Sequence, residues 1–208
     1  AANNTAVGKD ALTSNTTGAS NTAVGHKAGY SNTTATEMTA VGIEALYSNT
    51  TGNTNSALGR RALYSTTTGV NNAGFGARTL YTNTTGNYNV SIGMDSLYSN
   101  TTASNNTAVG YNALFANTTG AQNTAVGTLA SDAITTGAEN ASLGYWSLSG
   151  NTTGAYNTAL GSRALTANTT ASNNTAVGYQ SLHANTTGGN NTALGYSALA
   201  TNITGNYS

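Results

Sequence analysis

The chain contains no cysteine and no proline, and only 6% of its 208 residues are charged. The absence of cysteine excludes a scaffold that is held together by disulfides. Six basic residues balance six acidic ones, so the formal net charge is zero. Nucleic-acid binding needs clustered Lys and Arg, and this composition therefore argues against nucleic acid as a partner. No apolar run approaches the roughly 18 residues that a membrane-spanning helix requires.

Residues that could carry catalysis or hold a metal are also scarce. His26 and His183 lie far apart in the chain and at different positions of the repeat described below. The acidic residues show no calcium-loop spacing, and no serine has the surroundings of a nucleophile elbow. We therefore expect no catalysis and no cofactor. What the chain has instead is 40 Thr, 30 Asn and 25 Gly, which together make up 95 of its 208 residues.

An uninterrupted 17-residue repeat organises the whole sequence. It reads N-T-A-V-G-x-x-A-L-x-x-N-T-T-G-x-x, and we number its positions 1 to 17. Twelve units start at Asn4, Asn21, Met38, Asn55, Asn72, Asn89, Asn106, Asn123, Asn140, Asn157, Asn174 and Asn191. The pattern runs to both ends of residues 1–208, so we expect the chain to be a window of a longer array.

A strict repeat of one short unit is typical of a solenoid in which each unit forms one turn. Because Thr and Val favour strands, the sequence predicts an all-β fold, a parallel β-solenoid (β-roll) of twelve 17-residue coils in one elongated domain. Strands are expected at positions 1–5 and 8–10, with a third extended piece at 12–14. Gly at positions 5 and 15 and Asn at position 12 are expected to form the corners. At about 4.8 Å per coil, twelve coils make a rod about 58 Å long.

The core is expected to consist of position 4, which is always apolar, and position 9, which is usually Leu. In the seventh unit these residues are Val109 and Leu114. Two large apolar side chains per coil bury little surface against the conformational entropy of 17 residues. Positions 3 and 8, here Ala108 and Ala113, are always small, so a second chain could approach closely there. We therefore expect self-association into a homo-oligomer or a fibre.

Position 12 begins an Asn-x-Thr sequence in ten units, and each of these is an acceptor pattern for N-linked glycosylation. The hypothesis is a row of sugars along one edge of the solenoid. The alternative is structural, because stacked Asn and Thr side chains form hydrogen-bonded ladders. Two units lack the Asn but keep the position-14 Thr, which predicts a ladder role for that Thr row. Sugars linked to Thr hydroxyls are a further alternative. The ten candidates are Asn15, Asn32, Asn49, Asn83, Asn100, Asn117, Asn151, Asn168, Asn185 and Asn202.

Aromatic residues occupy position 10 in six consecutive units. These rings are expected to stack on one another from coil to coil, or to hold the rings of a polysaccharide. They are Tyr30, Tyr47, Tyr64, Tyr81, Tyr98 and Phe115. Nine of the twelve charged residues lie at positions 6 and 7, which indicates a corner that faces solvent.

The stretch "NTAVGYNAL" at 106–114 resembles the head repeats of trimeric autotransporter adhesins, the YadA-like heads, and similar repeats of phage and bacterial fibres. The shared pattern is a small-apolar-Gly triplet followed after two residues by Ala or Ser. Here it is Ala108-Val109-Gly110 with Ala113, and again Ala176-Val177-Gly178 with Ser181. The resemblance extends along the whole chain but covers only half of each unit. It implies a left-handed, trimeric parallel β-roll at the cell surface or in a virion fibre.

Three functions are compatible with these patterns. The first is a structural extracellular fibre or stalk coated with glycans. The second is an adhesin head or phage tail-fibre module that binds surface polysaccharide through the position-10 aromatics. The third is an ice-binding solenoid, because Thr arrays on a flat sheet can order water, although the tandem Thr residues of each unit point to opposite faces.

Overall fold

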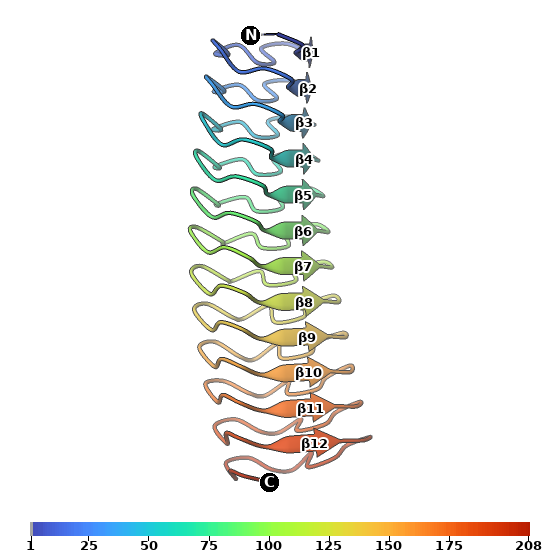
Figure 1. The fold of residues 1–208 in the computed structure, drawn as a ribbon. Coiled ribbons are helices and arrows are strands. Elements are labelled where there is room, and N and C mark those ends of the chain that lie inside the picture. The colour runs from blue at the N-terminus through green and yellow to red at the C-terminus, as the bar shows by residue number, and fades with distance from the viewer. Residues whose placement is uncertain (1) are drawn as a thin grey trace. The chain divides into compact units, whose positions relative to one another are not determined.

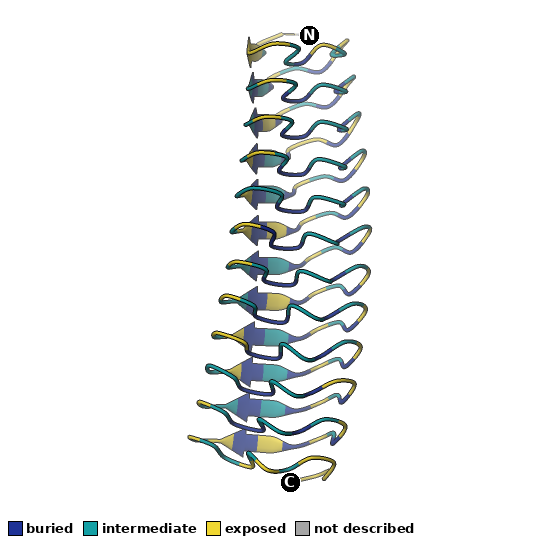
Figure 2. Cartoon of the chain, turned by 180° about the vertical axis from the view of Figure 1, so that it is seen from behind, coloured by how far each residue is buried: buried dark blue, intermediate teal, exposed yellow. Residues whose placement is uncertain are grey.

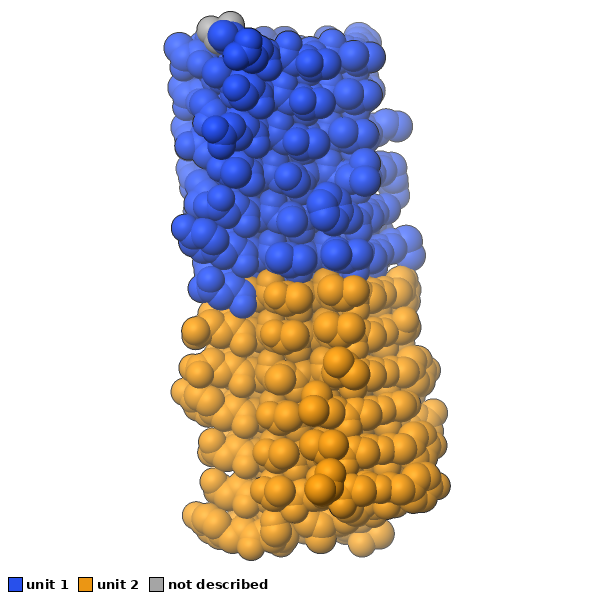
Figure 3. Space-filling view, turned by 45° about the vertical axis from the view of Figure 1, so that its right-hand side comes forward, with its two compact units in different colours: residues 1–105 blue, residues 106–208 orange. Residues whose placement is uncertain are grey.

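The computed structural model describes residues 2–208, which form short β-strands and turns and contain no helix. The chain divides into two compact units, residues 1–105 and residues 106–208 (Figure 3). Each unit holds six strands, one for each repeat. Those of unit 1 are β1 (Thr5–Val7), β2 (Thr22–Val24), β3 (Thr39–Val41), β4 (Ser56–Leu58), β5 (Ala73–Phe75) and β6 (Val90–Ile92). Those of unit 2 are β7 (Thr107–Val109), β8 (Thr124–Val126), β9 (Ala141–Leu143), β10 (Thr158–Leu160), β11 (Thr175–Val177) and β12 (Thr192–Leu194).

Within each unit, every strand pairs in parallel with the strand of the next coil (Figure 1). The pairing places each residue opposite the residue 17 positions later, so Ala6 faces Ala23 in unit 1 and Ala108 faces Ala125 in unit 2. The predicted all-β parallel β-solenoid, with one 17-residue coil per repeat, is confirmed. The left-handed sense and the length of the rod stay predictions.

The strands are shorter than predicted, because only positions 2–4 of each coil form one. Positions 7, 9 and 17 adopt left-handed backbone conformations in every coil, with φ at positions 7 and 9 between 49° and 60°. A left-handed residue interrupts an extended chain, so the predicted strand at positions 8–10 cannot form. The corner at position 5 is confirmed. Gly110 has a φ of 137°, and a Cβ there would lie only 2.5 Å from the carbonyl oxygen of Gly127 in the next coil.

Positions 12 and 15 flank a bend at positions 13–14, but neither has the left-handed backbone for which Gly and Asn were expected, since no residue at either position has a left-handed φ within residues 2–208. The backbone at position 15 is closely packed, and the position holds Gly in nine coils and Ala in the other three. A Cβ on Gly154 would lie 2.2 Å from the carbonyl oxygen of Ala171 and 2.4 Å from Oδ1 of Asn151. Position 15 is therefore a place of close approach inside the coil.

The core was assigned to the wrong strand residue. Side chains alternate along a strand, and the middle residue, at position 3, points inward while positions 2 and 4 point outward (Figure 2). Ala108 is fully buried, whereas Leu143 and Leu194 at position 4 expose 55% and 76% of their surface. Position 9 is confirmed as core, since Leu46 and Leu114 are fully buried. The small residues at positions 3 and 8 therefore face the interior, and they offer no approach to a second chain.

Two irregular coils show how tightly the interior is filled. The second coil has Gly29 in place of the core Leu, and Met38 of the third coil, in place of Asn, fills that space. A Cβ on Gly29 would lie 2.6 Å from Cε of Met38. In the eighth coil, the polar and apolar residues of positions 9 and 12 are exchanged. The buried Ser131 replaces Leu at position 9, and the buried Ile134 replaces Asn at position 12. Ser131 then donates a hydrogen bond of 2.8 Å to Oγ of Ser142.

Candidate functional site

Two ladders of buried asparagines line the interior of each unit. At position 12, Nδ2 of Asn168 donates to Oδ1 of Asn151 in the preceding coil at 3.0 Å and to the carbonyl of Ala171 at 3.0 Å. At position 1, the backbone N–H of the Asn donates to Oδ1 of the Asn 17 residues earlier, as Asn157 does to Asn140 and Asn174 to Asn157, both at 3.0 Å. These bonds satisfy amide groups that would otherwise be buried without a partner.

The ladder position conflicts with the glycosylation hypothesis. Eight of the ten candidate acceptors are fully buried, and Asn15 and Asn202 are partly buried. An N-linked sugar replaces a hydrogen of Nδ2, and Nδ2 is the atom that these side chains use inside the coil. The packing therefore leaves no room for a glycan at the buried positions, and the Asn of "NTT" is explained by the ladder. The fully buried candidates are Asn32, Asn49, Asn83, Asn100, Asn117, Asn151, Asn168 and Asn185.

The threonine ladder lies one residue earlier than predicted. At position 13, Oγ1 of Thr152 donates to the carbonyl of Thr169 in the next coil at 3.1 Å, and Thr50 does the same to Thr67. The position-14 threonines, Thr153 and Thr170 among them, are exposed in all twelve coils. The prediction of a position-14 ladder is therefore wrong, because that side chain points to solvent.

The predicted aromatic column at position 10 is confirmed in unit 1. Successive rings from Tyr30 to Tyr98 lie 5.0–5.2 Å apart, with interplanar angles of 5–10°. Both faces of Tyr47, Tyr64 and Tyr81 are covered by neighbouring rings, so these residues present edges to a ligand rather than faces. Partial burial, followed by the Glu44 carboxylate, raises the pKa of Tyr64. As a set, Tyr30, Tyr47, Tyr64, Tyr81, Tyr98 and Phe115 are half-buried.

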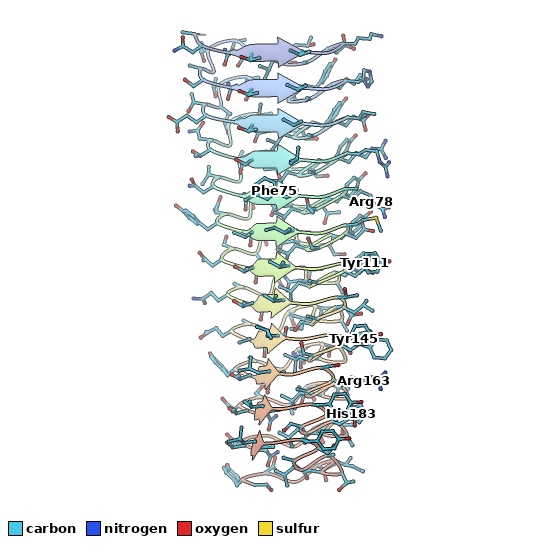
Figure 4. All side chains as sticks on the ribbon, turned by 90° about the vertical axis from the view of Figure 1, so that its right-hand side faces the viewer. Phe75, Arg78, Tyr111, Tyr145, Arg163 and His183 are labelled. Carbon is cyan, nitrogen blue, oxygen red and sulfur yellow. The ribbon has the colours of Figure 1, made fainter. Side chains whose placement is uncertain are left out.

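We call the outward-pointing side chains of positions 2 and 4 the outer face. It carries no charged residue in any of the twelve coils. Position 2 is Thr in eight coils, and position 4 is Val, Leu, Ile or Phe in all of them. In unit 1 the aromatic ring of Phe75 lies on this face (Figure 4). The outer face is thus a regular array of methyl and hydroxyl groups on a sheet that is open to solvent.

The edge that follows each strand, at positions 6 and 7, is charged in unit 1. Nε of Arg61 lies 2.7 Å from Oε2 of Glu44, and Arg78 pairs with Asp95. The guanidinium of Arg61 also lies 5.7 Å from the ring centre of Tyr64. This arrangement confirms a solvent-facing corner for most of these residues, although Asp95 is buried.

The same edge of unit 2 is aromatic. We call Tyr111, Tyr145, Trp146, Tyr179 and Tyr196 the ridge, and Figure 4 shows Tyr111, Tyr145 and Arg163 at this edge, beyond the ends of the strands. The exposed fraction of the ridge side chains ranges from 37% to 79%. Sequence reasoning missed this set, because it looked for long unbroken columns of aromatics and this column is interrupted by Thr128 and Ser162.

One ionisable group of unit 2 is unfavourably placed. Burial raises the pKa of Asp132, which takes the position-10 place that tyrosines fill in unit 1. Its Oδ1 is buried and has no hydrogen-bond partner within the described chain. The carboxylate therefore opposes folding at neutral pH.

No cavity or cleft opens within residues 2–208. The same residues contain no cluster of three or more His, Asp or Glu that could hold a metal ion. They also form no helix that is long and apolar enough to cross a membrane. The candidate sites are therefore surfaces, namely the outer face and the ridge.

These features define a β-solenoid repeat protein whose exposed sheet is uncharged and whose interior is partly polar. No protein-family model, curated protein or solved structure matches the chain.

Proposed function

We propose that this protein is a structural, self-associating β-solenoid, whose outer face docks on the outer face of a second copy. The apolar column at position 4 carries this proposal. Leu143, Leu160 and Leu194 expose between 38% and 76% of their surface, and no charge interrupts the column. Soluble proteins rarely leave a continuous apolar strip open to water unless another molecule covers it.

A second copy fits this face better than an unrelated partner does. The side chains of the face repeat at the strand spacing of about 4.8 Å. Another solenoid of the same sequence presents its side chains at the same spacing, so contacts made by one coil are repeated by the next. The trimer that the YadA-like resemblance implies is one assembly with this geometry.

The setting we propose is an extracellular fibre or stalk. The absence of cysteine, the neutral surface and the resemblance to fibre repeats support it. An N-linked coat is not part of the proposal, because the position-12 asparagines form the buried ladder. The ice-binding hypothesis concerns the same outer face, which presents Thr beside Val or Leu in most coils of unit 2.

Light scattering on the size-fractionated chain tests the proposal. The wild type should be a defined oligomer. Leu143→Asp combined with Leu160→Asp should yield monomers, because association would bury two carboxylates that have no partner of opposite charge. The matched control is Thr153→Asp combined with Thr170→Asp, which adds the same charge at exposed position-14 residues. A wild type that stays monomeric at high concentration would refute self-association. If that monomer caused thermal hysteresis, the outer face would be an ice-binding surface instead.

A further inference from the structure

The ridge of unit 2 is not required by the fold. Each of its side chains keeps between 37% and 79% of its surface open to solvent, so none of them is a core residue of the coil. The equivalent positions 6 and 7 of unit 1 hold eight charged residues and no Tyr, Trp or Phe, yet the coils there have the same strands and turns. The aromatic residues therefore need an explanation other than packing.

Aromatic residues occupy different positions of the repeat in the two units. Unit 1 has five tyrosines at position 10, where the rings cover one another, and none at positions 6 and 7. Unit 2 has one aromatic residue at position 10 and five at positions 6 and 7, where they are exposed. The remaining residues at this edge of unit 2 have hydroxyl, amide or aliphatic side chains, together with one Arg and no carboxylate. They are Asn112, Thr128, Leu129, Ser162, Arg163, Gln180 and Ser197.

The order of residues along the ridge alternates over the first five coils of unit 2, and Tyr196 follows in the sixth. From coil to coil, position 6 reads Tyr111, Thr128, Tyr145, Ser162 and Tyr179. The three rings are therefore two coils apart, about 9.6 Å at the spacing of parallel strands. Because a short hydroxyl side chain separates each pair, position 6 of the intervening coil supplies no ring between them. Tyr179 is covered on one side by Tyr196 of the next coil, whose ring centre lies 5.4 Å away with an interplanar angle of 20°. This differs from the position-10 column, where every coil supplies a ring.

The centre of the ridge is Trp146. Its ring stacks on Tyr145 at 5.3 Å with an interplanar angle of 7°, and the guanidinium of Arg163 lies 5.6 Å from its ring centre. The backbone below is held by hydrogen bonds of 2.9 Å, from Arg163 N–H to the carbonyl of Tyr145 and from Ser197 N–H to that of Tyr179. A rigid backbone fixes the spacing of the rings before any ligand arrives, which reduces the entropy lost on binding.

We propose that the ridge is a binding site for a neutral, extended polysaccharide that runs from coil to coil along unit 2. Aromatic rings stack on the apolar faces of pyranose rings, while hydroxyl and amide side chains bind the sugar hydroxyls. The spacing of alternate rings is comparable to the length of a disaccharide in an extended chain. A single guanidinium and no carboxylate match a neutral polymer better than an anionic or a cationic one. The proposal does not depend on self-association, because the ridge and the outer face share no residue.

The experiment uses Trp146, the only tryptophan of the chain, as its own reporter. The full-length protein is titrated with hexasaccharides of β-1,4-linked glucose, of α-1,4-linked glucose and of β-1,4-linked N-acetylglucosamine, and its fluorescence is recorded. At least one should cause a saturable change. Tyr145→Ala and Tyr179→Ala should each weaken that binding by roughly 2- to 10-fold, the effect of one aromatic contact. Tyr156→Ala removes an equally exposed tyrosine outside the ridge and should leave binding unchanged.

Three results would overturn the proposal. One is the absence of any fluorescence change, together with no retention of the protein on the corresponding insoluble polymers. Another is an equal loss of binding in Tyr156→Ala. The third is a loss of oligomer in the ridge variants without sugar binding by the wild type, which would make the ridge a protein interface. Light scattering on the same samples separates failure of this proposal from failure of self-association.

Discussion

The interior of the second and third coils offers a quantitative test of how the solenoid is packed. We consider Gly29→Leu, Met38→Asn and the double variant, which restores the common residue at both positions. Alone, Gly29→Leu places a side chain where Cε of Met38 would lie 2.6 Å and Cδ2 of Leu12 3.0 Å from the new Cβ. Overpacking of this kind destabilises by about 1–3 kcal/mol.

Met38→Asn alone removes a fully buried side chain and leaves a cavity beside Gly29. Loss of a buried Met costs about 2–5 kcal/mol, and the new amide offsets part of this by hydrogen bonds of about 1 kcal/mol each. In the double variant, Leu occupies the space that Met38 vacates, as in the ten coils that carry this Leu. We expect it to lie within about 1 kcal/mol of the wild type, with a coupling energy of about 2–3 kcal/mol.

Urea unfolding of the four proteins, followed by circular dichroism, measures the cycle. The control is a double variant of Gly29→Leu and Ile134→Val, a core residue of unit 2. These two residues share no contacts, so their effects on the free energy of unfolding should be additive. If the costs of Gly29→Leu and Met38→Asn simply add in the double variant, the two residues do not compensate, and the interpretation of this core is refuted.

Three further outcomes are expected. Asn168→Ala should lower the free energy of unfolding by about 2–4 kcal/mol, because it removes the hydrogen bonds of Asn168 to Asn151, Ala171 and Asn185 from the interior. Thr170→Ala in the same coil should change the free energy of unfolding by under about 0.5 kcal/mol. Equal effects of the two variants in urea unfolding would contradict the ladder. Burial raises the folded-state pKa of Asp132, so this residue lowers the free energy of unfolding as the pH rises from its ordinary pKa through the raised one. Asp132→Asn should therefore be more stable than the wild type above that pH window and equally stable below it. A gain in stability that persists at acid pH would show that burial of the carboxylate is not the reason. The intact mass of the folded protein should not change on treatment with an N-glycosidase, and a loss of sugar mass from the buried position-12 row would overturn the packing described for it.

Several features could be predicted from the sequence because they depend only on the repeat. A constant period places equivalent residues one coil apart, so the tyrosines of position 10 must meet one another, and they stack as predicted. The charged corner at positions 6 and 7 and the core role of Leu at position 9 follow in the same way. The ridge is within reach of the same reasoning, although Thr128 and Ser162 interrupt its column and conceal it from a search for unbroken columns.

The sequence by itself determined the architecture: an all-β solenoid with one coil per 17 residues and columns of identical side chains. Only the tertiary structure decided which columns lie inside. The left-handed turns at positions 7, 9 and 17 close each coil around a narrow interior, and that interior accepts Ala at position 3 but not the larger residue at position 4. Hydrophobicity alone would predict the reverse. The position-12 Asn side chains lie in the same narrow interior, because their amides donate hydrogen bonds to the backbone carbonyl of position 15 and to the Asn of the preceding coil. Sequence comparison among the repeats shows that Asn is favoured there, and the closed coil shows that its role is to pair buried backbone groups.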